Sequence, residues 1–179
     1  MKTDPPQPNR DVSIRCYVES DHDKVYALIQ QAFDRSDEAR LVDDLRYCGM
    51  MVLERVACLQ DGTIVGHVAY SRMTGTCDGL GLKVCTLAPV SVAPKHQNTG
   101  IGAALIEATM DTLQGMGEDV VLVLGMPEYY CRFGFDSELA KKFVGPYSGP
   151  VYMANGLTHA GRSSPVCEVS YATPFQALS

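Results

Sequence analysis

The chain has 179 residues, of which 46% are hydrophobic, and it carries a net charge of −6 at pH 7. A chain of this length can bury a hydrophobic core without disulfides or metals, so we expect a single domain over residues 11–179. Residues 1–10 carry three prolines and almost nothing apolar, which predicts a disordered lead-in. The acidic balance, without a basic cluster, disfavours nucleic acid and anionic membranes as partners and tolerates or mildly favours a cationic amine substrate.

The seven cysteines are an odd number, and no two of them form a C-x-x-C pair. The sequence also shows no signal peptide and no long apolar span. These features predict reduced thiols in a cytoplasmic protein, with neither a disulfide framework nor a metal site.

Hydrophobic periodicity predicts a definite order of strands and helices. The predicted elements are a strand at 14–18, helices at 25–33 and 37–46, strands at 52–59, 64–71 and 82–92, a helix at 103–114 and a strand at 120–124. Ser20 and Asp23 have the spacing of a capping box ahead of the first helix, and a loose loop is expected over 75–81. An antiparallel meander followed by one strand-helix-strand crossover predicts an α/β (α+β) fold with a mixed, mostly antiparallel central sheet and helices on both faces.

A glycine turn between the strand at 82–92 and the helix that follows is the best indication of function. Residues 94–103 contain Gly100 and Gly102 just before the helical run. Such a turn aims successive backbone N–H groups and the positive end of a helix dipole at one point, which is how proteins bind a pyrophosphate. It lacks the third glycine of a dinucleotide-binding loop and the lysine of a P-loop, so a different phosphate ligand is indicated.

Pro89 lies inside the strand that leads to this turn. Proline removes a ladder donor, so the strand is expected to be irregular or parted from a neighbour near its end. Backbone groups of Val90 and Val92, which point the same lateral way, would then be free to bond an extended ligand that carries amides. A pantetheine arm has that character.

The sequence at this point resembles the GCN5-related N-acetyltransferase (GNAT) family, and it looks closest to the bacterial YhbS-like subgroup. Residues 97–102 match the R/Q-x-x-G-x-G/A motif, and residues 66–69, 87–94 and 124–135 carry further likeness. The resemblance covers roughly residues 13–175.

The resemblance implies a GNAT fold, with a splayed strand pair at the cofactor site, and acetyl-CoA as cosubstrate without a metal. It implies that backbone groups contact the pantetheine and the pyrophosphate. The residues assigned in this way are Val90, Ser91 and Val92 for the pantetheine, and Gln97, Asn98, Thr99, Gly100, Ile101, Gly102 and Ala103 for the pyrophosphate.

Tyr130, four residues before Gly134-Phe135, holds the position of the family's tyrosine beside the thioester sulfur. The resemblance therefore implies that its phenol is the general acid for the departing thiolate, whereas Tyr129 is expected to pack in the core. No general base stands out, and Glu128, near the end of the presumed active-site strand, is the candidate. The asparagine that usually precedes the tyrosine in the family is missing here.

Three other side chains near these motifs are given structural interpretations. His67 is interpreted as a core histidine, and His96 is expected to lie in solvent. Arg132 could reach a phosphate, but a surface arginine is the favoured reading.

In the fold that the resemblance implies, the acceptor groove is bordered by residues 33–38 and by the C-terminal region. Phe33 and Glu38 are the predicted substrate-binding residues, since the acidic segment could receive an ammonium group; acids that simply stabilise a helix start are the favoured alternative. The predicted function is an acetyl-CoA-dependent N-acetyltransferase for a small amine, an aminoacyl compound or a peptide. A coenzyme A-binding sensor with little catalysis is the alternative, and a homodimer is left open.

Overall fold

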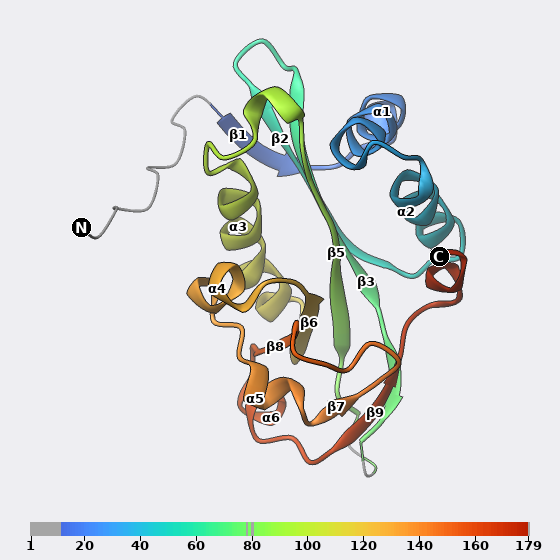
Figure 1. Ribbon diagram of the computed structural model, residues 1–179, viewed down its shortest axis with the longest axis vertical. Helices are drawn as coiled ribbons and strands as arrows, with labels where there is room; N and C mark the ends of the chain where they lie inside the picture. The colour runs from blue at the N-terminus through green and yellow to red at the C-terminus, as the bar shows by residue number, and fades with distance from the viewer. Residues whose placement is uncertain (1–11, 78, 80, 179) are drawn as a thin grey trace, which may run out of the picture.

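The computed structural model describes residues 12–77, 79 and 81–178, so the predicted lead-in at 1–10 lies outside the described residues. A six-stranded sheet forms the centre of the molecule (Figure 1). Its strands in spatial order are β1 (Val12–Cys16), β2 (Met51–Leu59), β3 (Ile64–Arg72), β5 (Val84–Val92), β6 (Val120–Leu124) and β8 (Tyr152–Gly156). Neighbouring strands are antiparallel except β5 and β6, which are parallel, as the predicted mixed sheet requires.

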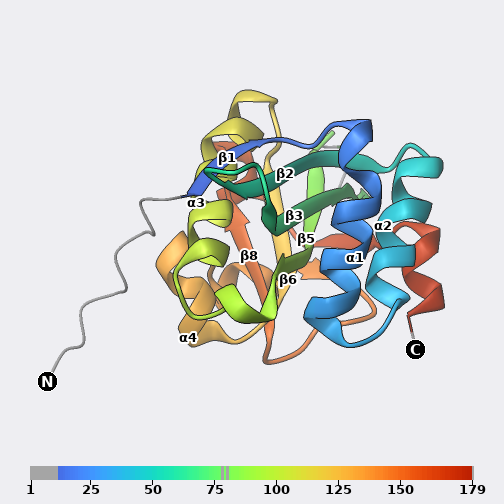
Figure 2. The ribbon, with the colours of Figure 1, turned by 90° about the horizontal axis from the view of Figure 1, so that it is seen from above.

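Helices cover both faces of the sheet, as predicted. Figure 2 shows α1 (His22–Phe33) and α2 (Asp37–Tyr47) on one side and α3 (Ile101–Gly115) on the other. Gly66 allows α3 to lie close to β3, because a Cβ at this position would stand 2.9 Å from Ile101 Cγ2 and 3.0 Å from Leu105 Cδ1.

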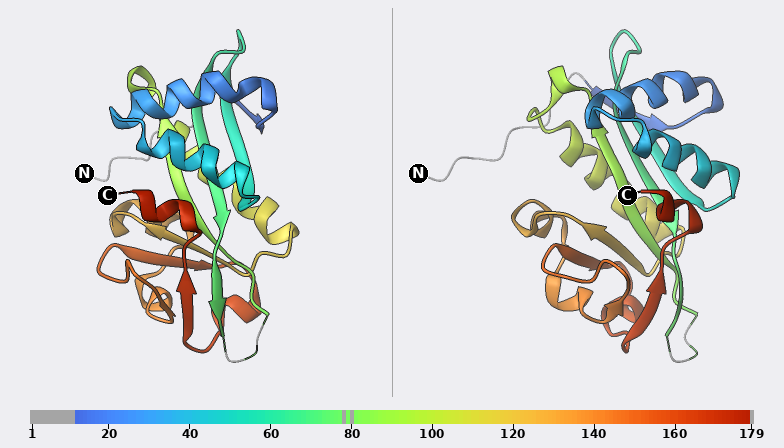
Figure 3. Two further views of the ribbon diagram at one scale, coloured as in Figure 1. Left: turned by 90° about the vertical axis from the view of Figure 1, so that its right-hand side faces the viewer. Right: turned by 45° about the vertical axis from the view of Figure 1, so that its right-hand side comes forward.

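Short elements complete the fold. They are η1 (Glu19–Asp21), η2 (Pro94–His96), α4 (Pro127–Tyr130), η3 (Cys131–Phe133), α5 (Ser137–Ala140), α6 (His159–Arg162) and η4 (Thr173–Ala177). A second sheet has the order β4 (Thr74–Thr76), β9 (Cys167–Ser170), β7 (Phe143–Val144). The C-terminal η4 lies beside α2, as both views in Figure 3 show, and Phe175 packs there with Leu41 and Leu45. None of the described helices has the length and apolar character needed to cross a membrane.

The strand β5 parts from β6 before it ends, which confirms the prediction made from Pro89. Its parallel pairing with β6 covers Val84–Thr86, whereas β5 continues to Val92. On the β3 side, Ala88 and Pro89 lie together opposite Ala69, since the register passes from Val68 paired with Val90 to Tyr70 paired with Leu87. This bulge bends the strand and leaves its last part with a free edge.

The backbone direction at this free edge follows from one hydrogen bond. Ala93 N–H donates to Val65 O at 2.9 Å, so residue 93 faces β3. Alternation along an antiparallel strand then turns the N–H and C=O groups of Val90 and Val92 toward the opposite, free edge. The backbone groups of both residues therefore face the free edge, as the sequence predicted, and the carbonyl of Val92 accepts a bond from Gln97 there.

The start of the first helix differs from the prediction. The helix α1 begins at His22 after the turn η1, and its N-cap, Asp21, makes no side-chain capping bond. The predicted capping box of Ser20 and Asp23 is wrong, because the turn begins two residues earlier: Val18 is the N-cap of η1, and the Asp21 carboxylate accepts from Val18 N–H at 3.0 Å and pairs with Arg15.

The cysteines also differ from the prediction, since Cys77 and Cys167 form a disulfide, with 4.4 Å between their Cα atoms. The predicted loose loop at 75–81 contains part of the short strand β4, which pairs with β9 and brings these two cysteines together. A separation of 90 residues along the chain gives no sign of this contact. Cys16, Cys48, Cys58, Cys85 and Cys131 are free thiols.

Candidate functional site

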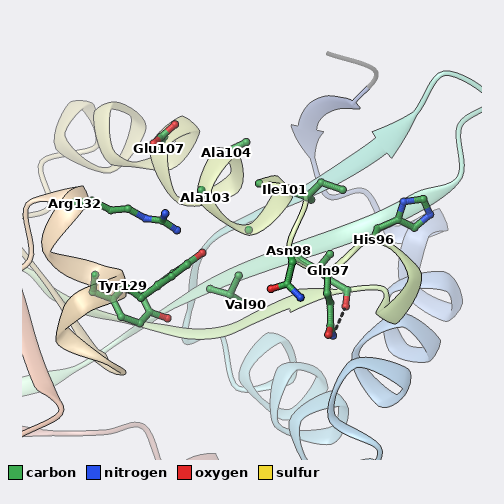
Figure 4. Close-up of a pocket in the computed structure, with 14 residues that line it drawn as sticks. Val90, His96, Gln97, Asn98, Ile101, Ala103, Ala104, Glu107, Tyr129 and Arg132 are labelled. Atoms are coloured by element: carbon green, nitrogen blue, oxygen red, sulfur yellow. Dashed lines mark hydrogen bonds between the residues drawn. The ribbon is translucent and has the colours of Figure 1, made fainter. Parts of the chain in front are cut away.

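A cleft of about 960 Å³ opens between the free edge of β5, the start of α3 and the segment α4–η3. We call it the α3 cleft (Figure 4). Its lining residues are Val90, Val92, His96, Gln97, Asn98, Gly100, Ile101, Gly102, Ala103, Ala104, Glu107, Tyr129, Tyr130 and Arg132.

The glycine turn forms one end of the α3 cleft. Asn98 and Gly100 have left-handed backbone conformations, with φ of 60° and 89°, and Gly100 is the N-cap of α3 without a side-chain capping bond. The first N–H groups of an α-helix have no acceptor within the helix. These donors and the positive helix end make the turn a suitable site for an anion.

Gly102 keeps the cleft open at the first turn of α3. A Cβ there would stand 3.2 Å from the Tyr129 hydroxyl oxygen and 3.7 Å from Val90 Cγ1. A ligand can therefore approach the backbone of α3 closely. An elongated ligand with phosphates at one end and amides along its length fits this arrangement.

The side chains of Arg132 and His96 lie at opposite ends of the α3 cleft. The Arg132 guanidinium stacks over the Tyr129 ring at 4.1 Å, on the α4 side, and His96 lies at the opposite end near Gln97, as Figure 4 shows. The Gln97 side chain also donates from Nε2 to Val92 O at 3.1 Å. This bond occupies at Val92 the position that an amide-bearing ligand would take.

Tyr130 lines the α3 cleft from α4. Its ring contacts Phe135 edge-on, with centroids 5.6 Å apart, and burial raises the pKa of Tyr130 to about 12. The phenol is therefore protonated at neutral pH.

A second cleft, of about 420 Å³, lies on the other side of β5, between α2 and the C-terminal segment. We call it the α2 cleft. Its lining residues are Phe33, Glu38, Leu41, Thr86, Leu87, Ala88, Pro89, Val90, Leu124, Tyr130, Tyr147, Tyr171, Phe175 and Leu178. Val90 and Tyr130 line both clefts, so the two meet where β5 parts from β6.

Most residues predicted from the sequence reach one cleft or the other. The α3 cleft holds both valines and most of the turn, and the α2 cleft holds Phe33 and Glu38, which were expected at an acceptor groove. The acids at this helix start also match the alternative interpretation, since Glu38 lies in the first turn of α2.

Three predicted residues are not brought to either cleft. Ser91 is buried, and because side chains alternate along β5 it faces the sheet side opposite to Val90 and Val92. Thr99 Oγ1 donates to His96 O at 2.6 Å within the turn. Glu128 is exposed on α4, and the geometry gives no support to a role as base.

For some other residues, the structure differs from what the sequence predicted. Tyr129 was expected in the core, but it is 36% exposed and lines the α3 cleft, as do His96 and Arg132. Arg132 stacks on Tyr129, three residues earlier. This spacing in the sequence was the one indication that the Tyr129 ring lies at the surface beside a cation. His67 is fully buried, as expected, with Nε2 2.8 Å from Glu54 Oε1.

Comparisons with known proteins agree with this geometry. Residues 13–137 match the model of the acetyltransferase (GNAT) domain. The chain is 34% identical to the uncharacterized N-acetyltransferase YhbS of Escherichia coli K12 over 69% of its length and 72% of the relative's. It is 33% identical to the uncharacterized N-acetyltransferase YjhQ of the same strain, over 73% of its length and 74% of the relative's.

Solved structures give the same result. The crystal structure of Escherichia coli YhbS in complex with CoA superimposes with a TM-score of 0.84 and 28% identity, covering 95% of this chain and 94% of that one. A GNAT family acetyltransferase from Brucella melitensis in complex with acetyl-CoA gives a TM-score of 0.76 and 28% identity, covering 92% and 97%. The chain therefore belongs to the GNAT family of N-acetyltransferases.

Proposed function

We propose that this protein transfers the acetyl group of acetyl-CoA directly to a primary amine, with the donor in the α3 cleft and the amine in the α2 cleft. The observation that carries the proposal is that Val90 and Tyr130 line both clefts, so two ligands can meet there without crossing the sheet. The solved relatives in complex with CoA and with acetyl-CoA support the choice of donor.

The residues of the α3 cleft fit such a donor. The N–H groups at the start of α3 and the turn from Gln97 to Gly100 would hold the pyrophosphate, and the free edge at Val90 would bond the amides of the pantetheine arm. Gly102 leaves the room that this close approach needs. Arg132 adds a positive charge on the α4 side.

Acetyl-CoA supplies a thioester, whose carbonyl carbon forms a bond to the amine nitrogen while its bond to sulfur breaks. The leaving thiolate then takes a proton, and the attacking nitrogen, which becomes the amide nitrogen, releases one to water; that proton balances the one that water later returns to the acid. Tyr130 is the proton donor that lines both clefts, and burial raises its pKa to about 12, which keeps the phenol neutral. After donating, its phenolate takes a proton back from water.

The amine enters as the free base in this scheme, so the chain needs no dedicated base. The α2 cleft is lined mostly by apolar and aromatic side chains, and the fraction of the amine that carries no proton is the form that attacks. This agrees with the position of Glu128 outside both clefts.

The test compares Tyr130→Phe with the wild-type protein in an assay that detects free CoA thiol. We expect kcat to fall about 100-fold or more, because a general acid typically contributes that much. The rise in melting temperature that acetyl-CoA causes should persist, because the phenol hydroxyl is not needed to hold the donor.

Tyr47→Phe is the matched control, since Tyr47 is 95% exposed at the end of α2 and its hydroxyl touches neither cleft. An unchanged kcat for Tyr130→Phe would remove Tyr130 from the chemistry. Absence of any thermal stabilisation by acetyl-CoA in the wild-type protein would reject the donor itself.

A further inference from the structure

We infer that the acceptor is an arylalkyl monoamine, a single ammonium or amine on a short chain that carries an aromatic ring, with the nitrogen bound beside Glu38. The inference rests on the proposed function and names the substrate class for the α2 cleft. Its volume of about 420 Å³ lies in the lower part of the range of small-molecule sites.

Aromatic rings from separate parts of the chain make up much of the wall of this cleft. Phe33 comes from the end of α1 and Tyr130 from α4, while the C-terminal region supplies a ring cluster. In that cluster Tyr171 lies edge-on to Tyr147 and tilted against Phe175, with both pairs of ring centroids 5.0 Å apart. A planar ring in the ligand would find edge-to-face partners in this wall.

The cleft offers one carboxylate to its ligand. Glu38 is 7% exposed, and Arg35 donates from Nε to both of its carboxylate oxygens at 3.0 Å, which fixes the orientation of the group. Arg35 itself is half-exposed and does not line the cleft. Among the described residues, no lysine or arginine lines the cleft.

This distribution of charge discriminates between classes of amine. A polyamine would bring further ammonium groups into apolar walls without a second carboxylate, and an unpaired buried charge is costly. A free amino acid would bring its own carboxylate next to that of Glu38, and the nearby guanidinium of Arg35 does not line the cleft and already bonds both Glu38 oxygens. A monoamine with an apolar body avoids both penalties.

The test measures thiol release with acetyl-CoA and a panel of amines. 2-Phenylethylamine and phenylalanine form a matched pair that differs by one carboxylate, and spermidine and a lysine-containing peptide represent the other classes. We expect kcat/KM for 2-phenylethylamine to exceed that of each of the other three at least about tenfold, which corresponds to roughly 1.4 kcal/mol.

Two variants examine the assigned contacts. Glu38→Gln should raise KM for 2-phenylethylamine about tenfold or more, because a bond to a charged group is lost, while Asp44→Asn, on the exposed side of the same helix, should leave KM unchanged. Phe33→Ala removes a ring that is 38% exposed. It should lower kcat/KM for 2-phenylethylamine more than for ethylamine.

The outcomes separate this inference from the proposed function. Equal or better turnover of spermidine, phenylalanine or the peptide overturns the acceptor class and leaves acetyl transfer intact. Acetyl-CoA binding without turnover of 2-phenylethylamine also overturns the acceptor class. Failure of acetyl-CoA to stabilise the protein, together with no thiol release from any amine, rejects the proposed function instead.

Discussion

The ring of Tyr130 occupies the space that any side chain at residue 125 would need. A Cβ built on Gly125 collides with Tyr130 Cε2 and stands 2.6 Å from Cδ2. Gly125 cannot retreat easily, because its N–H donates to Val151 O at 2.8 Å. The glycine that ends β6 therefore decides where the phenol lies.

Gly125→Ala should displace the Tyr130 ring from the junction of the two clefts. We expect kcat to fall toward the value of Tyr130→Phe, because a general acid works only within hydrogen-bonding reach of its target. Acetyl-CoA should still raise the melting temperature, since the turn at the start of α3 is untouched. Steady-state kinetics and thermal unfolding measure the two effects.

Gly115→Ala serves as the control for this variant. A Cβ at Gly115 meets nothing within 4 Å, and alanine is favoured at the end of a helix over glycine. It should leave kcat unchanged. A Gly125→Ala enzyme with full kcat would contradict the link between this glycine and the phenol.

Gly102→Ala should weaken binding of acetyl-CoA. The added Cβ would stand 3.2 Å from the Tyr129 hydroxyl, and it would narrow the cleft where the donor approaches α3. We expect the dissociation constant, measured calorimetrically, to rise about tenfold, because a single poorly placed group costs roughly 1–3 kcal/mol.

Gly102 could be needed to make room for the donor or to make room for the Tyr129 hydroxyl. The double variant Gly102→Ala, Tyr129→Phe distinguishes these two explanations. The second change removes the hydroxyl next to the new methyl group. If Gly102 makes room for the donor, binding stays weak in the double variant, which is the result we expect. Full recovery would mean that Gly102 merely accommodates Tyr129.

Deprotonation of Tyr130 should not lower kcat/KM at any pH up to about 11. A tyrosine must be protonated to act as an acid, and burial raises the pKa of Tyr130 from its ordinary value near 10 to about 12. The kcat/KM for an amine should therefore rise with pH as the amine loses its proton and then stay level to about pH 11. A decline centred near pH 10, in protein shown by circular dichroism to be folded, would contradict the assignment.

Glu118→Gln should destabilise the fold through Arg72. The Arg72 guanidinium donates to both oxygens of Glu118, at 2.6 Å and 2.5 Å, and the Glu118 side chain is 2% exposed whereas that of Arg72 is 32% exposed. We expect the free energy of unfolding in urea to fall by about 2 kcal/mol, less than for a fully buried pair because water reaches Arg72.

Glu138→Gln is the matched control for this ion pair. Lys141 pairs with Glu138, but both side chains are largely exposed. Its removal should change the free energy of unfolding by about 0.5 kcal/mol or less. Equal losses in the two variants would show that burial of Glu118 adds nothing.

The order of strands and helices was predictable because periodicity reports which face of an element is buried. Pro89 also predicted a break in strand pairing, because proline has no N–H to donate. The strand β5 does part from β6. Gly100 marked the turn for the same local reason, since its left-handed backbone conformation suits glycine. Such features depend on neighbours in the chain.

The features that the sequence did not predict depend on how separate segments of the chain are placed in the fold. The bond between Cys77 and Cys167 needs the pairing of β4 with β9, and a three-residue strand has too few residues to show a period. The place of Tyr129 depends on how α4 faces α3, which its own sequence does not specify. Glu128 was nominated by its position after β6, but the turn of α4 points it into solvent.

The two clefts differ in what holds their ligands. In the proposed function, backbone groups at the free edge of β5 and at the start of α3 hold the donor, so many side-chain changes in β5 would leave its binding as it is. The α2 cleft is built of side chains from α1, α2, α4 and the C-terminal segment. With the amine bound there as proposed, substitutions in these side chains would redirect the protein to a new amine while the donor is retained, and acceptor choice would evolve independently of the acetyl source.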